Sequence, residues 1–461
     1  MDEPAPRPAA GGPGQTAANQ RARPALTVVA GSVTVLILAA LLGGALGSLA
    51  KAACRAGAWN VGVEQYQAHC YTDIYPLYFA EGLSSGQVPY FDHHVEYPVV
   101  MGAVMQGAAW TVSNIADPAA RGREFYDVTV ALLAASLVAG VLATAYCAGR
   151  TRRWTALLVA FSPALILAAY INWDLLAMAL TMAALAAWAA RKPVLAGVLL
   201  GVAVATKFYP VICLVPLFAL CLRAGRLRQF GHALTAAAAA WLVINLPVAI
   251  AAPSGWATFY SFNASRGADW GSIWYFFQAE HWPLLGGLST SEINLISGAL
   301  FAAGCIVVAA LALMAPRRPR LPQLIFLATA AFLLTNKVWS PQYVVWLVPL
   351  VVLARPRLGG YVIWQIAEVG YFYAIWAYLI YYSNLVNPTA PAAPGGIGMG
   401  LYFAALLARF VTVLLLCALV IRDILRPQLD VIRADDESDD PAGGVLDGAA
   451  DRLVLTLAGR A

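Results

Sequence analysis

Residues 26–50 read LTVVAGSVTVLILAALLGGALGSLA, an apolar run without a charged side chain. A run of this length can cross a hydrocarbon core of about 30 Å as a helix. Comparable runs recur as far as Ile421, and only 11% of the 461 residues are charged. Soluble domains carry about 25% charged residues, which is more than twice this fraction. The mean hydropathy of the chain is also high, at +0.69. The sequence therefore predicts an integral membrane protein, and an all-α one, because a lipid-exposed backbone must satisfy its own hydrogen bonds.

The apolar runs predict a polytopic bundle of about 12–13 transmembrane helices. We place the runs near 26–50, 97–116, 125–147, 154–171, 174–190, 193–206, 208–222, 232–252, 293–314, 321–335, 343–354, 361–381 and 399–421. Clusters of basic residues, which mark cytoplasmic loops, begin at Arg150, Arg191, Arg223, Arg317, Arg355 and Arg422. An even number of runs separates successive clusters, so they agree on one orientation. Both chain ends are then cytoplasmic if 97–116 is re-entrant or interfacial, which leaves about 12 full spans.

Three regions follow from composition. Residues 1–25 are predicted to be a disordered cytoplasmic tail, residues 26–425 the transmembrane domain, and residues 426–461 an acidic, mostly disordered cytoplasmic tail. Residues 51–96 form a long first loop on the outer face. Of seven cysteines, Cys54 and Cys70 share this loop, and we hypothesise a disulfide between them. No cysteine spacing resembles a zinc or haem site, so neither a metal nor a cofactor is predicted.

The stretch YTDIYPLYFAEGLSSGQVPYFDHHVEYP (71–98) gathers acids, histidines and aromatic residues in a chain that otherwise avoids charge. It faces the same side as four other unusual polar groups. Isolated ionisable residues at the ends of membrane helices commonly mark substrate paths. We therefore predict a site on the outer face, built from residues 71–98 together with 172–174, 206–208, 266–269 and 336–343.

Several of these motifs resemble a known family. They are an acidic residue in a long first outer loop, Glu-Tyr-Pro at 96–98, a helix break at Lys-Phe-Tyr-Pro (207–210), and TNKVWSPQYVVWLVPL at 335–350. Together they resemble the polyprenyl-phosphate-mannose-dependent α-mannosyltransferases of glycosyltransferase family 87, within the GT-C superfamily, over roughly residues 60–355. The resemblance implies a GT-C-like multi-helix enzyme that takes a sugar from a lipid phosphate and transfers it on the outer face.

The residues suit that chemistry. Inverting glycosyl transfer needs a carboxylate that deprotonates the acceptor hydroxyl. Asp73 is the preferred base, with capping of the helix that follows it as the alternative role. Glu96 is the second candidate, and its alternative role is to cap the helix that begins at Tyr97.

The departing phosphate needs cationic partners. Lys337 and Lys207, at outer helix ends, either bind this phosphate or extend toward lipid headgroups. Arg409 lies in the middle of an apolar run, as does Glu368. A charge there is costly unless it is paired, so a structural ion pair between these two is favoured over a phosphate contact by Arg409.

Further substrate contacts are predicted from polar and aromatic residues of the same face. The alternatives are helix capping for Asp174, an exposed loop position for His94, and the interfacial aromatic belt for the tryptophans and Tyr343. Trp270 and Trp274 are additional sugar platforms of this kind. The predicted substrate-binding residues are Asp174, His94, Trp339, Gln342 and Tyr343.

The predicted function is a cell-membrane glycosyltransferase, in a bacterial plasma membrane, acting on the extracytoplasmic side. Its partners are a polyprenyl-phosphate sugar donor, with mannose as the expected sugar, a glycolipid or polysaccharide acceptor of the cell envelope, and membrane lipids. Nucleic acid is not a predicted partner, because the net charge of +5 comes from short loops. A transporter or lipid flippase is the first alternative, although no repeated halves are evident. A scaffold protein with decayed catalytic residues is the second.

Overall fold

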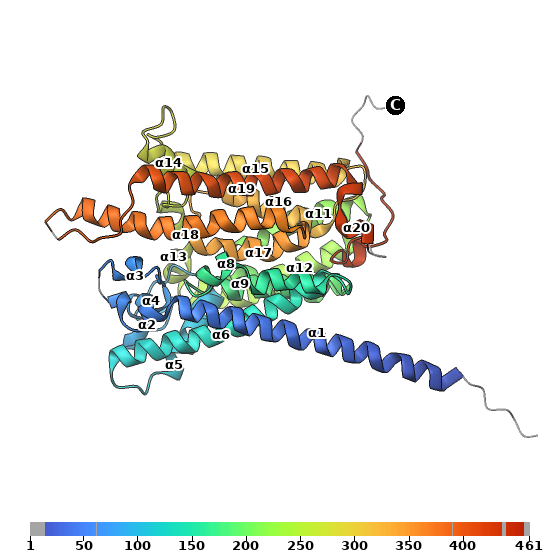
Figure 1. Ribbon diagram of the computed structural model, residues 1–461, viewed down its shortest axis with the longest axis horizontal. Helices are drawn as coiled ribbons and strands as arrows, with labels where there is room; N and C mark the ends of the chain where they lie inside the picture. Colours follow the sequence, from blue (N-terminus) through green and yellow to red (C-terminus); the bar gives the residue numbers. More distant parts are fainter. Residues whose placement is uncertain (1–13, 61, 390, 436–438, 456–461) are drawn as a thin grey trace, which may run out of the picture.

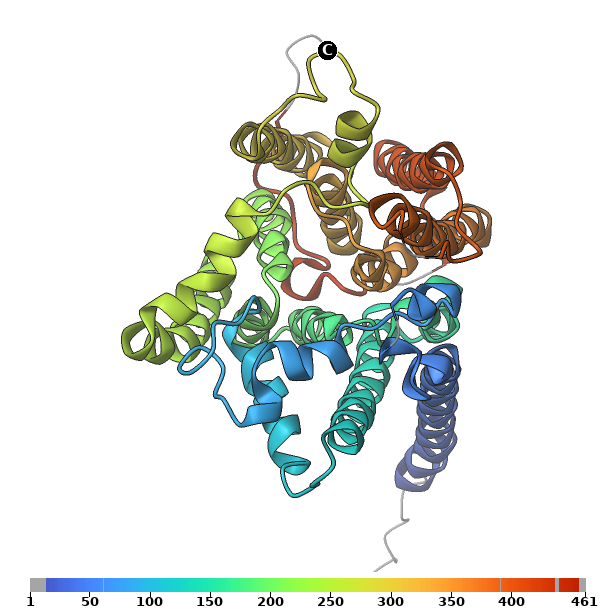
Figure 2. The same cartoon turned by 90° about the vertical axis from the view of Figure 1, so that its left-hand side faces the viewer.

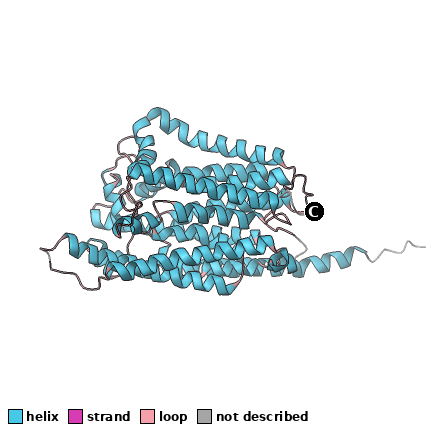
Figure 3. Cartoon of the chain, turned by 90° about the horizontal axis from the view of Figure 1, so that it is seen from above, coloured by secondary structure: helices cyan, strands magenta, loops and turns pink. Residues whose placement is uncertain are grey.

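The computed structural model describes residues 14–60, 62–389, 391–435 and 439–455. These residues form helices and connecting loops with no β-strand, as Figure 3 shows by colour. The all-α fold class is thereby confirmed. Of the predicted N-terminal tail, residues 1–13 lie outside the described residues, and residues 14–25 form the start of the first helix.

Among the described residues, five helices are long and apolar enough to cross a membrane. They are α1 (Gly14–Ala50, with its apolar part at Gly31–Ala50), α6 (Pro118–Cys147), α12 (Leu227–Ala251), α15 (Thr290–Met314) and α19 (Met399–Leu425). Shorter apolar helices accompany them: α5 (Val99–Thr111), α9 (Asp174–Ala189), α10 (Pro193–Thr206), α11 (Leu214–Arg223), α16 (Leu321–Thr335) and α17 (Val344–Ala354). The aromatic helix α18 (Leu358–Val386) packs beside α19 in the same bundle.

The remaining helices are short and serve the loops. They are α2 (Ala52–Arg55), α3 (Glu64–Gln67), α4 (Ile74–Ala80), α7 (Leu157–Ala160), α8 (Pro163–Ala168), α13 (Pro253–Ser265), α14 (Ile273–Ala279) and α20 (Val431–Asp435). Several 3-10 turns lead into helices, among them η4 (Tyr209–Cys213) before α11 and η5 (Pro341–Tyr343) before α17.

Small residues let α10 and α12 approach closely. A Cβ atom on Gly197 would lie 2.2 Å from the carbonyl oxygen of Ala233, and one on Gly201 would lie 2.3 Å from that of Ala237. Only glycine fits such contacts, which are typical of helix pairs in membranes. This packing fixes the end of α10, from which Lys207 projects.

One end of the bundle collects the loop elements. Figure 1 shows α2 to α5, α13 and α14 at this end, and Figure 2 looks onto it. Helix α3 packs on α18, while α4 packs on α6. With 13 residues, α5 is about 20 Å long, which is shorter than a hydrocarbon core of about 30 Å. This length is consistent with a re-entrant or interfacial position for 97–116.

The basic clusters lie at the opposite end, where Figure 1 shows α20. Arg320 is buried and pairs with Asp430 at 2.8 Å, and it also donates to the carbonyl oxygens of Leu353 and Ala354. Arg223 and Arg318 both pair with Asp451, at 2.8 and 2.7 Å. The sequence predicts mostly disorder after residue 426, whereas the described residues of this segment form ion pairs with two basic loops, at Arg223 and at 318–320.

The positions of these two ends predict accessibility in cells. In a background that retains only Cys54 and Cys70, Asp92→Cys and Leu284→Cys should react with a membrane-impermeant maleimide from outside, because both side chains are exposed at the loop-rich end. Arg226→Cys and Arg228→Cys, exposed at the other end, should react only after permeabilisation. Labelling of Leu284→Cys from the inside alone would contradict the predicted orientation.

Candidate functional site

A cavity of about 650 Å³ opens among the loops at the end that holds α2 to α5. Aromatic and amide side chains form much of its wall, including Trp270, Tyr343, Asn172 and Gln342. Three carboxyl groups, one amine and one guanidinium also line it, those of Asp73, Glu96, Asp269, Lys207 and Arg266. Acids and cations therefore meet in one chamber at the end where the sequence predicts the site.

Asp73 precedes α4 but does not cap it. Its side chain makes no capping hydrogen bond, and the Thr72 hydroxyl instead accepts from the Ile74 amide at 3.2 Å. The Asp73 amide donates to the carbonyl oxygen of Ile171 at 2.7 Å, while the Tyr71 hydroxyl donates to the Asp73 carboxylate at 2.6 Å. The carboxylate is therefore directed at the cavity by both the backbone and a neighbouring phenol.

The two candidate bases differ from free carboxyls. Burial raises the pKa of Asp73 to about 6, although the Tyr71 hydrogen bond and the Lys207 charge oppose the rise. Burial also raises the pKa of Glu96, against the charges of Arg266 and Lys207. A carboxyl with a pKa near the working pH is suited to accept a proton during a reaction.

Lys207 is held by an ion pair at the start of α9. Its ammonium lies 2.8 Å from Asp174 Oδ1. The helix-capping alternative for Asp174 is not realised, because the Asn172 side chain accepts from the Asp174 amide at 3.0 Å. Burial lowers the pKa of Lys207, but attraction by Asp174, Tyr343 and Asp73 outweighs it and leaves this pKa raised. Lys207 therefore stays charged beside the cavity.

Arg266 is the second cation of the cavity. It follows α13, and its guanidinium lies 3.6 Å from Asp269 Oδ1. The sequence marks 266–269 as an unusual polar group on the outer face but assigns neither residue a role. An isolated arginine beside an acid and Trp270 was the available signal.

Lys337 binds the backbone of the loop that carries Arg266 and does not line the polar cavity. Its ammonium donates to the carbonyl oxygens of Ala264 at 3.1 Å and Arg266 at 2.7 Å. The Asp269 amide donates to the Lys337 carbonyl oxygen at 2.8 Å. Burial and the Arg266 charge lower the pKa of Lys337. Lys337 thus anchors the loop that carries Arg266.

Arg409 is buried and does not line the cavity. Its guanidinium lies 3.0 Å from Glu368 Oε2, stacks between the rings of Trp339 and Tyr371 at 4.1 and 4.3 Å, and donates to the Trp339 carbonyl oxygen at 2.9 Å. The structure contains the ion pair that the sequence favours, and this pairing occupies the Arg409 side chain.

Some of the other predicted substrate-binding residues line the cavity, and others do not. Gln342 and Tyr343 line the cavity. Asp174 reaches it only through Lys207. Trp339 is fully buried beneath Arg409, and His94 is exposed to solvent and is not part of the lining.

The tryptophan platforms divide in the same way. Trp270 lines the cavity, whereas Trp274 is buried and donates to the carbonyl oxygen of Thr335 at 2.9 Å. Only Trp270 of this pair is placed to contact a ligand.

An aromatic wall completes the chamber and was not predicted. Tyr66 and Tyr71 both stack on Trp376, with ring centroids 5.8 and 4.7 Å from the centroid of the tryptophan ring. All three line the cavity. Because Trp376 belongs to α18 and the tyrosines to the first loop, no local pattern in the sequence connects them.

A second cavity of about 400 Å³ adjoins the first. It is lined mainly by apolar side chains of η4, α13, α15 and α16, among them Ile212, Tyr260, Phe301 and Phe332. The two cavities share Lys207, Phe259, Asn263 and Tyr343. A polar chamber and an apolar one therefore meet at a lysine.

The fold and the site define a polytopic membrane protein with a chamber suited to group transfer between polar substrates at one end of its bundle. Residues 119–341 match the model of Glycosyltransferase family 87, so the chain carries a domain of this family and is a membrane glycosyltransferase. The matched range includes Lys207, Arg266 and Lys337 but not Asp73 or Glu96. No curated protein and no solved structure matches the chain.

The anchoring contacts of Lys337 predict a local change in dynamics. In Lys337→Met, amide hydrogen exchange over residues 264–272 should accelerate at least about tenfold, because hydrogen bonds from a charged group contribute about 1.5–3 kcal/mol. Lys207→Met is the matched control, since Lys207 makes no hydrogen bond to this loop. Exchange measured by mass spectrometry that stays at the wild-type rate in Lys337→Met would contradict the anchoring role.

Proposed function

We propose that this protein transfers a sugar, with mannose as the first candidate, from a polyprenyl-phosphate donor to a hydroxyl of a cell-envelope glycolipid or polysaccharide on the outer face. The observation that carries the proposal is the junction at Lys207 between a polar chamber with two candidate bases and an apolar chamber. A donor with a charged headgroup and a hydrocarbon chain has this same division.

The donor would lie across the junction. Its chain would occupy the apolar cavity, and its phosphate would lie at Lys207 and Arg266, the two cations that line the polar cavity. We do not propose Lys337 or Arg409 as phosphate ligands. Backbone carbonyl oxygens accept hydrogen bonds from Lys337, and Glu368 pairs with Arg409. A compact ammonium and a planar guanidinium together suit a phosphate that gains charge as it departs.

The transferred sugar would lie in the polar chamber. Trp270 and Tyr343 offer aromatic faces, and Gln342 and Asn172 offer amide groups for sugar hydroxyls. The aromatic wall of Tyr66, Tyr71 and Trp376 is then available to the acceptor. The preference for mannose comes from the resemblance to the family.

The reaction is a single displacement. The acceptor oxygen forms a bond to the anomeric carbon while Asp73 takes the hydroxyl proton. The bond between the anomeric carbon and the phosphate oxygen breaks, and its electron pair leaves with the polyprenyl phosphate. The added phosphate charge is stabilised by Lys207 and Arg266. Attack opposite the leaving group inverts the anomeric configuration.

The family domain favours this function over the transporter and scaffold alternatives. A transporter needs no proton acceptor beside its ligand, and a scaffold needs no charged chamber. Asp73 with its raised pKa and the two cations of the same chamber support an enzyme.

Replacing the proposed base tests the mechanism directly. Asp73→Asn should lower turnover by a factor of about 10² or more, because the amide cannot accept the acceptor proton, while donor affinity stays near wild type. The assay is transfer from a short-chain polyprenyl-phosphate mannose in detergent, with a lipid extract of the host envelope as acceptor. Asp92→Asn is the control, since Asp92 lies in the same loop but is exposed. Half of wild-type turnover in Asp73→Asn would remove Asp73 from the mechanism and favour Glu96.

The pH profile should report the same carboxyl. Below the pKa of about 6, Asp73 carries a proton and cannot act as a base, so kcat/KM should fall about tenfold per pH unit on the acidic side and level off above it. The measurement is the initial rate at fixed ionic strength across the titration range. A flat profile through this range would show that no carboxyl with a raised pKa limits the reaction.

A further inference from the structure

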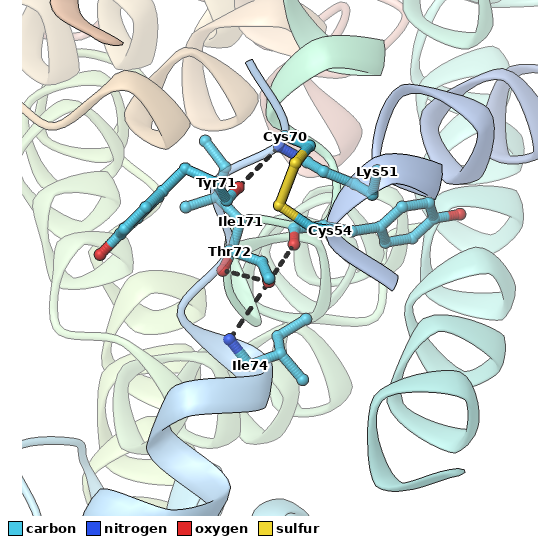
Figure 4. Close-up of a disulfide and its surroundings, with 8 residues drawn as sticks. Lys51, Cys54, Cys70, Tyr71, Thr72, Ile74 and Ile171 are labelled. Atoms are coloured by element: carbon cyan, nitrogen blue, oxygen red, sulfur yellow. Dashed lines mark hydrogen bonds between the residues drawn. A yellow bond between two sulfur atoms is a disulfide. The ribbon is translucent and has the colours of Figure 1, made fainter. Parts of the chain in front are cut away.

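The consecutive residues 70–73, which include the proposed base, are attached to two other segments of the protein, 51–54 and 170–171. Cys70 forms a disulfide with Cys54 of α2, as hypothesised from the sequence. The Tyr71 carbonyl oxygen accepts from the Lys51 ammonium at 2.8 Å. The Thr72 hydroxyl donates to the carbonyl oxygen of Tyr170 at 2.8 Å. Figure 4 shows the disulfide of Cys70, the Lys51 bond to Tyr71 and the Thr72 bonds in this short segment, which precedes Asp73 in the sequence.

Lys51 is the unusual member of this set. It follows α1, its side chain is fully buried, and it forms no ion pair with a carboxylate of the described residues. Its ammonium lies 5.4 Å from the centre of the Phe372 ring. A buried ammonium without a carboxylate partner is costly. Burial lowers the pKa of Lys51 to about 7, and only the charge of Asp73 acts against that shift.

We propose that Lys51 is a positioning residue for Asp73: its ammonium holds the Tyr71 carbonyl and, through Tyr71, the orientation of the Asp73 carboxylate. This inference rests on the proposed function, in which Asp73 is the base. The disulfide between Cys54 and Cys70 is the second, covalent anchor of the same segment. Neither Lys51 nor the two cysteines line the cavity, so they act on the reaction only through residues 71–73.

The geometry explains how a distant lysine affects the carboxylate. The Lys51 bond fixes the peptide plane between Tyr71 and Thr72. The Tyr71 ring stacks on Trp376, and the Tyr71 hydroxyl donates to Asp73. Since a displacement of about 1 Å at a reacting group can lower a rate by about 10², holding this peptide plane matters to proton transfer. A hydrophobic side chain at position 51 would fill the site but leave the Tyr71 carbonyl without its donor.

The test combines activity with stability. In Lys51→Met, kcat should fall about tenfold while the donor KM stays within about twofold, because donor contacts are untouched. Thermal stability should be unchanged or higher, since a buried charge without a carboxylate partner has been removed. A residue with a purely structural role would show the opposite: lower stability with normal kcat in the folded fraction.

The disulfide between Cys54 and Cys70 allows a second, independent test of the positioning role. The double variant Cys54→Ser/Cys70→Ser should also lower kcat at constant donor KM, and here with a lower melting temperature. Arg55→Gln is the matched control. Arg55 is a cation of the same short helix, but it pairs with Asp127 on the exposed surface, and its replacement should leave kcat at the wild-type value.

The acidic limb of the pH profile separates positioning from general damage. Asp73 is faced by Tyr71 from its own segment, Lys207 after α10, Glu96 before α5 and Asp174 at the start of α9. These groups all remain in Lys51→Met. Loss of the Lys51 charge should therefore move the acidic limb to higher pH, because one cation near Asp73 has been removed.

Asp73→Asn measured in parallel distinguishes the two possible failures. If Asp73→Asn is inactive but Lys51→Met has wild-type kcat and an unmoved acidic limb, the positioning role of Lys51 is overturned and the proposed function stands. If Asp73→Asn keeps half of wild-type turnover, the base is elsewhere and both are overturned. A lowered kcat with a shifted limb in Lys51→Met and an inactive Asp73→Asn support both.

Discussion

The ion pair between Lys207 and Asp174 is the interaction on which the site depends. It joins the end of α10 to the start of α9, and it lies where the polar and apolar cavities meet. An ammonium in such surroundings keeps its charge more readily when a carboxylate accompanies it. Asp174 provides that partner without entering the lining of either cavity. Lys207 therefore remains a cation that a phosphate can approach from the cavity side.

Two buried arginines elsewhere in the protein are fully engaged by acids and carbonyl oxygens and leave nothing for a ligand. Arg409 pairs with Glu368 and stacks between two rings, and Arg320 pairs with Asp430 while donating to two carbonyl oxygens. Charges of this kind are costly inside a membrane protein unless they are fully engaged. Arg266 differs from Arg409 because it lies on a cavity wall. Its guanidinium is 3.6 Å from Asp269, whereas Arg409 forms a closer ion pair with Glu368.

The sequence predicts the fold class and the end of the molecule that holds the site, because apolar length and arginine placement are strong constraints in a membrane. It also singles out Asp73, Glu96, Lys207, Gln342 and Tyr343, which the structure places on one cavity. It cannot predict which way a side chain points from a broken helix. Lys337 and Trp339 belong to the same polar string as Gln342, yet one turns to backbone carbonyls and the other lies beneath Arg409. The contribution of Trp376 depends on packing between residues about 300 positions apart, and nothing local in the sequence encodes such a contact.

The proposed base and the proposed phosphate-binding cations come from different parts of the chain, and a short backbone segment connects them. Asp73 lies before the range that matches the family, whereas Lys207 and Arg266 lie within it. The Asp73 amide is bound to the carbonyl oxygen of Ile171, three residues before Asp174, which in turn holds Lys207. The backbone from 171 to 174 is thus a short link between the proposed proton acceptor and the proposed phosphate-binding cation. A displacement reaction requires the attacking and leaving groups to lie on opposite sides of one carbon. A four-residue link between Asp73 and Lys207 fixes this placement better than two independent loops would. The attachment of residues 70–72 to Lys51, Cys54 and Tyr170 then constrains the first loop relative to that link.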